Sequence, residues 1–258
     1  MILGISYNIF DSEDLLEESI NLIRDKVDFI SVVYQVVSNY GFSNPELEDL
    51  LINLRDKGLI DCLVQYTPDL NMKAIENAVR KRNIGLQMSR QNSCTHHMSM
   101  DADEYYVPKE FEYMIKEIEK NQYDGAACQL TTYYKNTSFR IEPKETYYVS
   151  TIFKIKANNK FIINDIFPVL VDPSRIIKSK SVRIFSRNEI EMHHLSWVRK
   201  DISVKLLNSD SRLYNFEYID NIINHFENWK FGEKALVPQG GQKVNFVNVI
   251  ETKNLFKN

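Results

Sequence analysis

Hydrophobic positions follow two different periods over the first 132 residues of the chain. Short runs of apolar, β-branched and aromatic residues predict strands, and between these runs apolar residues recur every three or four positions, as on one face of a helix. The predicted strands span residues 2–7, 29–34, 59–66, 95–100 and 126–132. Predicted helices begin at Asp11 or Ser12, at Asn44–Pro45, near Asn71 and at Pro108.

This alternation predicts the fold class. Repeated strand and helix units with short connections favour an α/β fold, with a mostly parallel, Rossmann-like central sheet flanked by helices on both faces. The part from about 133 to 190 is less regular and rich in β-branched and aromatic residues. A helix predicted around 218–229 indicates a small C-terminal helical extension.

Composition narrows the class of protein. The chain has 258 residues, 43% of them hydrophobic, and a formal charge of −3, so it offers no basic field for a nucleic-acid partner. Three widely spaced cysteines, Cys62, Cys94 and Cys128, favour a reducing compartment over a disulfide framework. The N-terminus turns polar too soon for a signal peptide, and no apolar run approaches the roughly 18 residues of a membrane-spanning helix. We therefore expect a cytoplasmic protein.

Two carboxylates follow the fourth predicted strand, in the sequence SCTHHMSMDADEYY. Asp101 and Asp103 flank the small Ala102, and residues i and i+2 that leave a strand project to the same side. Both can face one divalent cation, which can bridge to a diphosphate. An isolated pair of this kind is usually a solvated turn, but open α/β sheets bind ligands at the carboxyl ends of their strands.

Arg82 lies on the apolar stripe of the helix predicted before this pair, with Asn83 beside it. A buried arginine needs an anionic partner. Two alternatives stay open: a structural carboxylate such as Glu76, or a nucleotide diphosphate next to the metal.

A later segment, EMHHLSWVRKDI, adds an imidazole. Strand alternation allows only one of His193 and His194 to face the ligand side, where it could be a third ligand for the cation. Lys200 or Lys205 could add positive charge near the phosphates. The other pair, His96 and His97, lies too far upstream of Asp101 and is interpreted as structural.

Three features of the sequence carry a family resemblance: the first strand ending in YN, the Arg and Asn before MDADE, and the segment HHLSWVRKDI. With these features the chain resembles a GT-A glycosyltransferase of the bacterial family 2 kind over about its first 205 residues. The resemblance implies a GT-A-like fold with a nucleotide-binding half at 1–104, an acceptor half at 105–205 and an extension at 206–258. It also implies a nucleotide-diphosphate sugar donor, by family preference a UDP-sugar, and Mn²⁺ or Mg²⁺.

The resemblance further implies a sugar transfer to a hydroxyl of a glycan or glycolipid, in bacterial surface polysaccharide synthesis. The aromatic and basic C-terminal segment could dock to a membrane-bound acceptor, which would place the protein peripherally at the membrane, or to another subunit. Tyr34 and Gln35 stand where the family usually has aspartates. Carried over residue by residue, the donor-binding positions are Tyr7, Asn8, Gln35, Arg82, Asn83, Asp101 and Lys205. The metal ligands are Asp101, Asp103 and His194.

An inverting transferase also needs a carboxylate that takes the acceptor proton. Asp165 is our candidate, because the stretch beyond the acidic pair would form the acceptor side. Its alternative is a turn aspartate after Asn164. Glu142, Glu145 and Asp172 remain open as the base, and so does a retaining mechanism.

Other functions fit the pattern less well. A sugar nucleotidyltransferase would need a glycine-rich phosphate loop near the first strand, where Gly4 stands alone. A haloacid-dehalogenase-like phosphatase takes its carboxylates from the first strand, which here ends in Tyr7 and Asn8. A non-catalytic nucleotide-binding or sugar-binding protein remains the alternative hypothesis.

Overall fold

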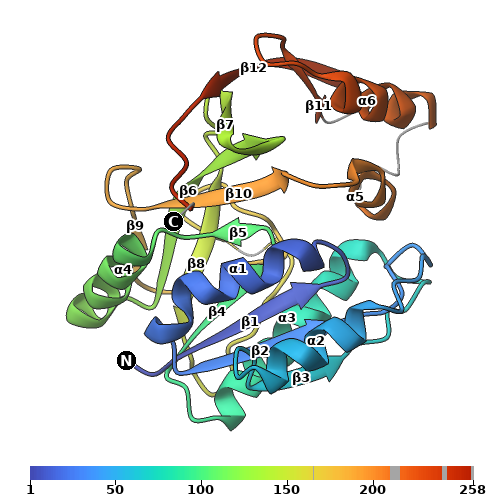
Figure 1. Cartoon of the computed structure of the whole chain (residues 1–258). Coiled ribbons are helices and arrows are strands. Elements are labelled where there is room, and N and C mark those ends of the chain that lie inside the picture. Colours follow the sequence, from blue (N-terminus) through green and yellow to red (C-terminus); the bar gives the residue numbers. More distant parts are fainter. Residues whose placement is uncertain (165, 210–215, 240–242, 257–258) are drawn as a thin grey trace. The chain divides into compact units, whose positions relative to one another are not determined.

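The computed structural model describes residues 1–164, 166–209, 216–239 and 243–256 (Figure 1). The chain forms two compact units. The first unit comprises Met1–Leu130 and Thr146–Met192, and the second comprises Thr131–Glu145 and His193–Asn258. The division predicted at 104 and 205 concerns function and stays a prediction. None of the helices described is long and apolar enough to cross a membrane.

The first unit is built on a mixed sheet in the order β6-β8-β4-β1-β2-β3, with β9 beside β6. The neighbours from β4 to β3 are parallel, and β8 is antiparallel to both β4 and β6. The strands are β1 (Leu3–Ile9), β2 (Phe29–Tyr34), β3 (Cys62–Gln65), β4 (His96–Asp101), β5 (Glu104–Tyr105), β6 (Gly125–Tyr134), β8 (Tyr148–Lys154) and β9 (Val182–Ile184). The predicted mostly parallel sheet is confirmed.

The helices of this unit are α1 (Glu13–Ile23), the short 3₁₀ helix η1 (Arg24–Lys26), α2 (Leu47–Asp56), α3 (Ala74–Gln91) and α4 (Pro108–Asn121). They form for the reasons that the sequence indicates. Pro108 occupies the first turn of α4, and Gly58, with φ +77°, follows the end of α2. The helix α3 begins three residues later than predicted, where the Lys73 amide donates to the Glu76 carboxylate at 3.0 Å.

Helices cover both faces of the sheet, as predicted (Figure 1). Adjacent side chains on β1 show this, because they point to opposite faces. The Tyr7 hydroxyl is hydrogen-bonded to Ser19 of α1 at 3.0 Å, whereas Ser6 faces Gly85 of α3. Every residue of β2 is buried, which is typical of a parallel strand covered on both sides.

The second unit has an antiparallel sheet in the order β11-β12-β7. Its elements are β7 (Asn136–Glu142), α5 (Ile202–Asn208), α6 (Phe216–Asn228), β11 (Ala235–Gln239) and β12 (Lys243–Glu251). Strand β10 (Glu191–Trp197), like β6, runs along the chain from the first unit into the second.

The core of the second unit is aromatic. The Tyr134 ring meets the rings of Phe226 and Trp229 edge-on, at centroid distances of 5.3 and 5.2 Å. The helix predicted around 218–229 lies in α6, but the strands β11 and β12 were not predicted. The extension is therefore not purely helical.

The close approach of α3 to β1 can be tested at Gly85. Replacing a glycine inside an open helix by alanine stabilises it by about 1 kcal/mol. A methyl group at position 85 would instead overlap the Ser6 side chain, and serine and strand would have to shift. We expect Gly85→Ala to lower the free energy of unfolding in urea by roughly 1–3 kcal/mol. Gln87→Ala, at an exposed position of the same helix, is the control, and a stabilised Gly85→Ala protein would contradict the contact.

Candidate functional site

The carboxyl ends of β1 and β4 bring the first predicted residues together. Asn8 and Asp101 are register partners in the parallel pair of β1 and β4. The Asn8 amide donates to the Ser99 hydroxyl at 2.9 Å, which ties the two strand ends to each other. The edge of the sheet that the sequence indicated is thus where these polar side chains meet.

Arg82 reaches this edge from α3. It is 4% exposed, and its guanidinium donates to the Ser99 hydroxyl at 2.7 Å from Nη1 and to the Ser174 hydroxyl at 3.3 Å from Nε. Its Nη2 lies 3.4 Å from Oδ2 of Asp101. The carboxylate closest to Arg82 in this structure is therefore that of Asp101 and not that of Glu76.

Arg175 is the residue that the sequence analysis missed. Its Nη2 pairs with both Asp101 and Glu104. The side chains of Arg175 and Glu104 are 4% and 3% exposed, so this is a buried ion pair. Asp172 completes the cluster, with Oδ2 3.8 Å from Nε of Arg175 and 3.9 Å from Nη2 of Arg82.

The two arginines determine the charge of Asp101. Burial by itself would raise the pKa of Asp101, but Arg175 and then Arg82 outweigh it and hold the pKa below its ordinary value. Burial raises the pKa of Glu104, although Arg175 opposes the shift. Asp101 is therefore a carboxylate at neutral pH, held in place from two sides.

Asp101 and Asp103 fit a divalent cation. The charge of Asp103 raises the pKa of Asp101, so the two carboxylates are close enough to repel each other, and a cation would relieve this. Their oxygens are the ligands that Mn²⁺ and Mg²⁺ prefer. Within the described residues no three His, Cys, Asp or Glu side chains form a metal site, so other ligands would have to complete the coordination.

Comparison with known proteins relates part of this chain to a known family. Residues 61–185, which contain α3, the acidic pair and Arg175, match the family described as Glycosyl transferase family 2. The chain has a GT-A fold, and this part of it resembles glycosyltransferase family 2. No curated protein sequence matches it significantly.

Solved structures of similar fold include TarS residues 1–349 of S. aureus in complex with UDP-GlcNAc. This structure is 12% identical with a TM-score of 0.50, over 88% of this chain and 72% of that one. The structure of TarS residues 1–349 without a named ligand is 14% identical with a TM-score of 0.49, over 88% of this chain and 71% of that one. A third structure is the glucosyl-3-phosphoglycerate synthase from Mycobacterium tuberculosis, in complex with Mn²⁺, UDP and phosphoglyceric acid. It is 12% identical with a TM-score of 0.32, over 53% of this chain and 45% of that one.

Three of the predicted donor-binding side chains are engaged within the protein. Tyr7 has no exposed surface and binds Ser19, and burial raises its pKa. Gln35 is 1% exposed, and its amide donates to the Val37 carbonyl at 2.8 Å. Asn83 brackets the backbone of Phe161, accepting from its N–H at 2.8 Å and donating to its carbonyl at 3.1 Å.

The remaining predicted residues are placed as follows. His194 and Lys205 belong to the second unit, and their part in the site stays a prediction. On β10, His193 is the buried imidazole, with Nδ1 2.9 Å from the Tyr133 hydroxyl, and His194 is only half-buried. Lys205 donates to the Ser196 carbonyl at 3.0 Å.

Asp165 lies outside the described residues. His97 is fully buried and hydrogen-bonded to Ser89 at 2.8 Å, as its structural interpretation requires.

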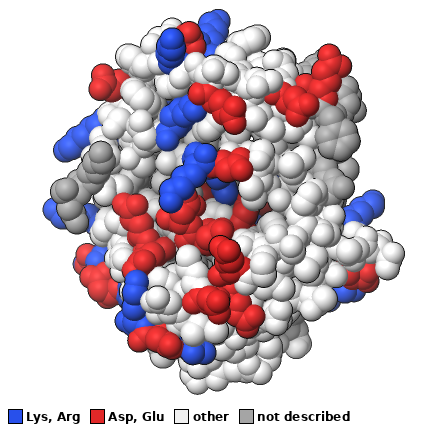
Figure 2. Space-filling view, turned by 45° about the vertical axis from the view of Figure 1, so that its right-hand side comes forward, with Lys and Arg blue, Asp and Glu red and all other residues white. Residues whose placement is uncertain are grey.

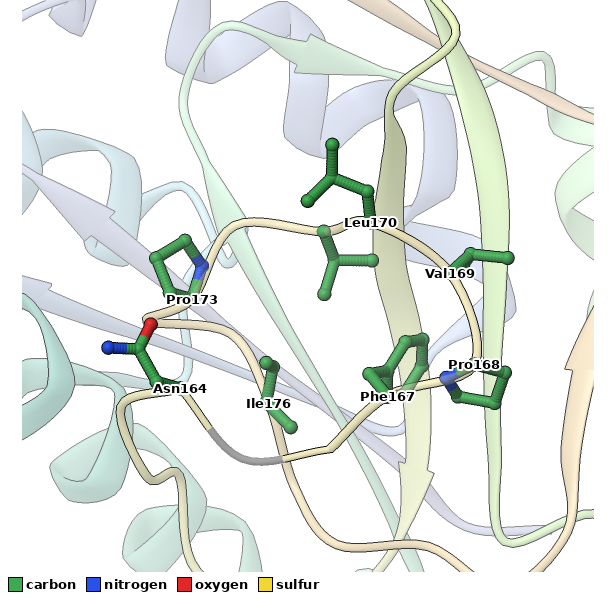
Figure 3. A pocket seen from close by; sticks show the side chains of 8 residues that line it. Asn164, Phe167, Pro168, Val169, Leu170, Pro173 and Ile176 are labelled. Atoms are coloured by element: carbon green, nitrogen blue, oxygen red, sulfur yellow. The ribbon is translucent and has the colours of Figure 1, made fainter.

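A cleft of about 550 Å³ lies in the segment that leads to Arg175 (Figure 3). Its lining is mostly apolar and includes Phe167, Pro168, Leu170, Pro173 and Ile176. Pro173, which follows Asp172 in the sequence, is thus part of this lining. On the molecular face shown in Figure 2, acidic and basic side chains lie close together.

The buried pair of Arg175 and Glu104 should dominate the local stability. Arg175→Met leaves the buried Glu104 without its partner and Asp101 with Arg82 alone, so we expect a loss of about 3–5 kcal/mol in the free energy of unfolding in urea. Adding Glu104→Gln removes the buried unpaired charge and should recover much of this loss. Arg55→Met, which breaks the exposed pair with Asp56, is the control and should cost less than about 1 kcal/mol. A loss for Arg175→Met no larger than the control would disprove the buried pair.

Proposed function

We propose that this glycosyltransferase transfers a sugar from a nucleotide-diphosphate sugar, most suitably a UDP-sugar, to a hydroxyl of a glycan or glycolipid acceptor. The observation that carries the proposal is the cluster of Arg82, Arg175 and Asp101, with Asp103 beside it, at the carboxyl end of β4. The fold shared with a TarS structure that contains UDP-GlcNAc supports the choice of donor.

Asp101 and Asp103 would hold Mn²⁺ or Mg²⁺, with His194 as the proposed third ligand. When bound, the metal would supply positive charge against the negative charge that develops on the departing diphosphate. Lys205 is proposed to add to this charge from α5.

The protein's own residues prepare the site for this chemistry. Arg82 and Arg175 keep Asp101 ionised and fix its orientation, and Ser99 and Ser174 hold the guanidinium of Arg82. Because these groups are buried and already hydrogen-bonded, they need little rearrangement when charge develops. Burial at this edge also strengthens their electrostatic effect relative to water.

The acceptor side is proposed to lie beside the cleft that Pro173 and Leu170 line. Asp165 is our proposed base, which would take the proton of the acceptor hydroxyl. Asp172 is the second candidate, since its carboxylate is 41% exposed and lies at the charged cluster. The proposed acceptor belongs to bacterial surface polysaccharide synthesis, with the enzyme at the cytoplasmic side of a membrane as a peripheral protein.

A panel of nucleotide sugars, assayed for hydrolysis and transfer with Mn²⁺, Mg²⁺ or EDTA, tests the donor and the metal together. We expect turnover of at least one UDP-sugar, its loss in EDTA, and a decrease in kcat of roughly 100-fold or more in Asp101→Asn and Asp103→Asn. Glu112→Gln, on the exposed face of α4, is the control. If UDP binds but no donor is turned over, the protein is a non-catalytic nucleotide-binding protein.

The two candidate bases can be separated by their effects on transfer and on donor binding. We expect Asp165→Asn to reduce transfer to the acceptor by roughly 100-fold, while the Kd for UDP measured by calorimetry stays the same. Asp172→Asn should reduce transfer far less. The opposite ranking would assign the base to Asp172, and equal small effects would exclude both.

A further inference from the structure

Lys81 is a buried cation that the mechanism above does not use. It lies on α3 beside Arg82 and is 8% exposed. Within the described part of the chain its ammonium has neither a hydrogen bond nor an ion pair, although Arg82 and Arg175 are each paired with Asp101. Lysines are almost never buried this far without a partner, because removing the charge from water costs free energy.

Gly85 of α3 packs against Ser6 of β1, and Ser89 packs against Gly4. Lys81 lies one helical turn before Gly85 on the same face of α3, so it faces the carboxyl end of β1.

The charges around Lys81 agree with this position. Burial lowers the pKa of Lys81 to about 8, Asp101 opposes this shift, Arg82 adds to it, and Asp11 again opposes it. Asp101 ends β4 and Asp11 lies between β1 and α1. The ammonium therefore lies near the carboxyl ends of β1 and β4, at the same edge of the sheet as the charged cluster.

We propose that Lys81 binds the diphosphate of the donor and is held at the edge of the sheet without a partner of its own until the donor arrives. This assignment rests on the proposed function. It adds a donor-binding residue that neither the sequence analysis nor the family resemblance indicated.

A phosphate suits this position better than a sugar or a base. An ammonium is a compact charge with three hydrogen-bond donors. A nearby anion offsets the free-energy cost of burying it, and neutral hydroxyls or carbonyls offset this cost far less. The two arginines of the cluster, Arg82 and Arg175, already form ion pairs with carboxylates. Among the described residues of this edge, Lys81 is thus a cation that can accept an anionic ligand without first breaking an ion pair.

Binding should then be linked to protonation. Near pH 8 about half of the free protein carries a neutral Lys81. A diphosphate favours the charged form and raises the pKa, so the protein takes up a proton when the ligand binds. The affinity should therefore fall as the pH rises from 8 towards 10.

Titration calorimetry with UDP and with uridine, in Mg²⁺ at pH 7, tests the contact. We expect Lys81→Met to raise the Kd for UDP by roughly 10- to 100-fold and to leave the Kd for uridine unchanged. Arg80→Met removes an exposed cation from the same helix and is the matched control. Lys81→Met should fold, because methionine fills the space without a buried charge, and its melting temperature should equal or exceed that of the wild type.

Repeating the UDP titration at pH 8 in buffers of different ionisation enthalpy measures the number of protons that the protein takes up for each UDP bound. We expect an uptake of about half a proton in the wild type that is absent in Lys81→Met. Unchanged UDP affinity in Lys81→Met, or an equal loss for UDP and uridine, would overturn the assignment while leaving the proposed function intact. Failure of the wild type to bind UDP would overturn both.

Discussion

The charged network between Asp101, Arg175, Glu104 and Arg82 is the interaction on which the rest of the site depends. It joins the end of β4, the helix α3 and the segment that contains Asp172. Arg82, Arg175 and Glu104 are at most 5% exposed, and a charge buried this deeply costs free energy unless it has a partner. The network therefore keeps Asp101 ionised and fixes its orientation, and it does so with residues that are far apart in the sequence.

The pattern of the sequence predicted most of the first unit for a simple physical reason. Its strands and helices bury one face or both, so the periods of 2 and 3.6 are visible in the order of residues. Arg82 was found because it interrupts the apolar stripe of α3, and Asp101 because it follows a strand. The strands β11 and β12 escaped prediction because polar and apolar residues alternate only weakly in KVNFVNVIE.

The orientation of single side chains was harder to predict. Arg175 lies in an irregular segment, 74 residues beyond Asp101, where no period shows which residues turn inward. Tyr7 and Asn8 are neighbours on one strand, so only one of them can face α1, and the structure gives that face to Tyr7. Asn83 and Gln35 were predicted to bind the donor, but their side-chain amides form hydrogen bonds with nearby backbone groups. Tertiary contacts decide these cases, and the sequence does not display them.

The bracket that Asn83 forms around Phe161 has a further consequence. Phe161 marks one end of a surface segment, and Ser174 and Arg175 mark the other, where Arg82 and Asp101 hold them. Both ends are thus anchored to α3 and β4, while the residues between them line the cleft. A loop anchored in this way can vary in length and composition without disturbing its attachment points. Under the proposed function, related chains could therefore acquire new acceptor preferences by exchanging this one stretch, with the donor-binding residues inherited unaltered.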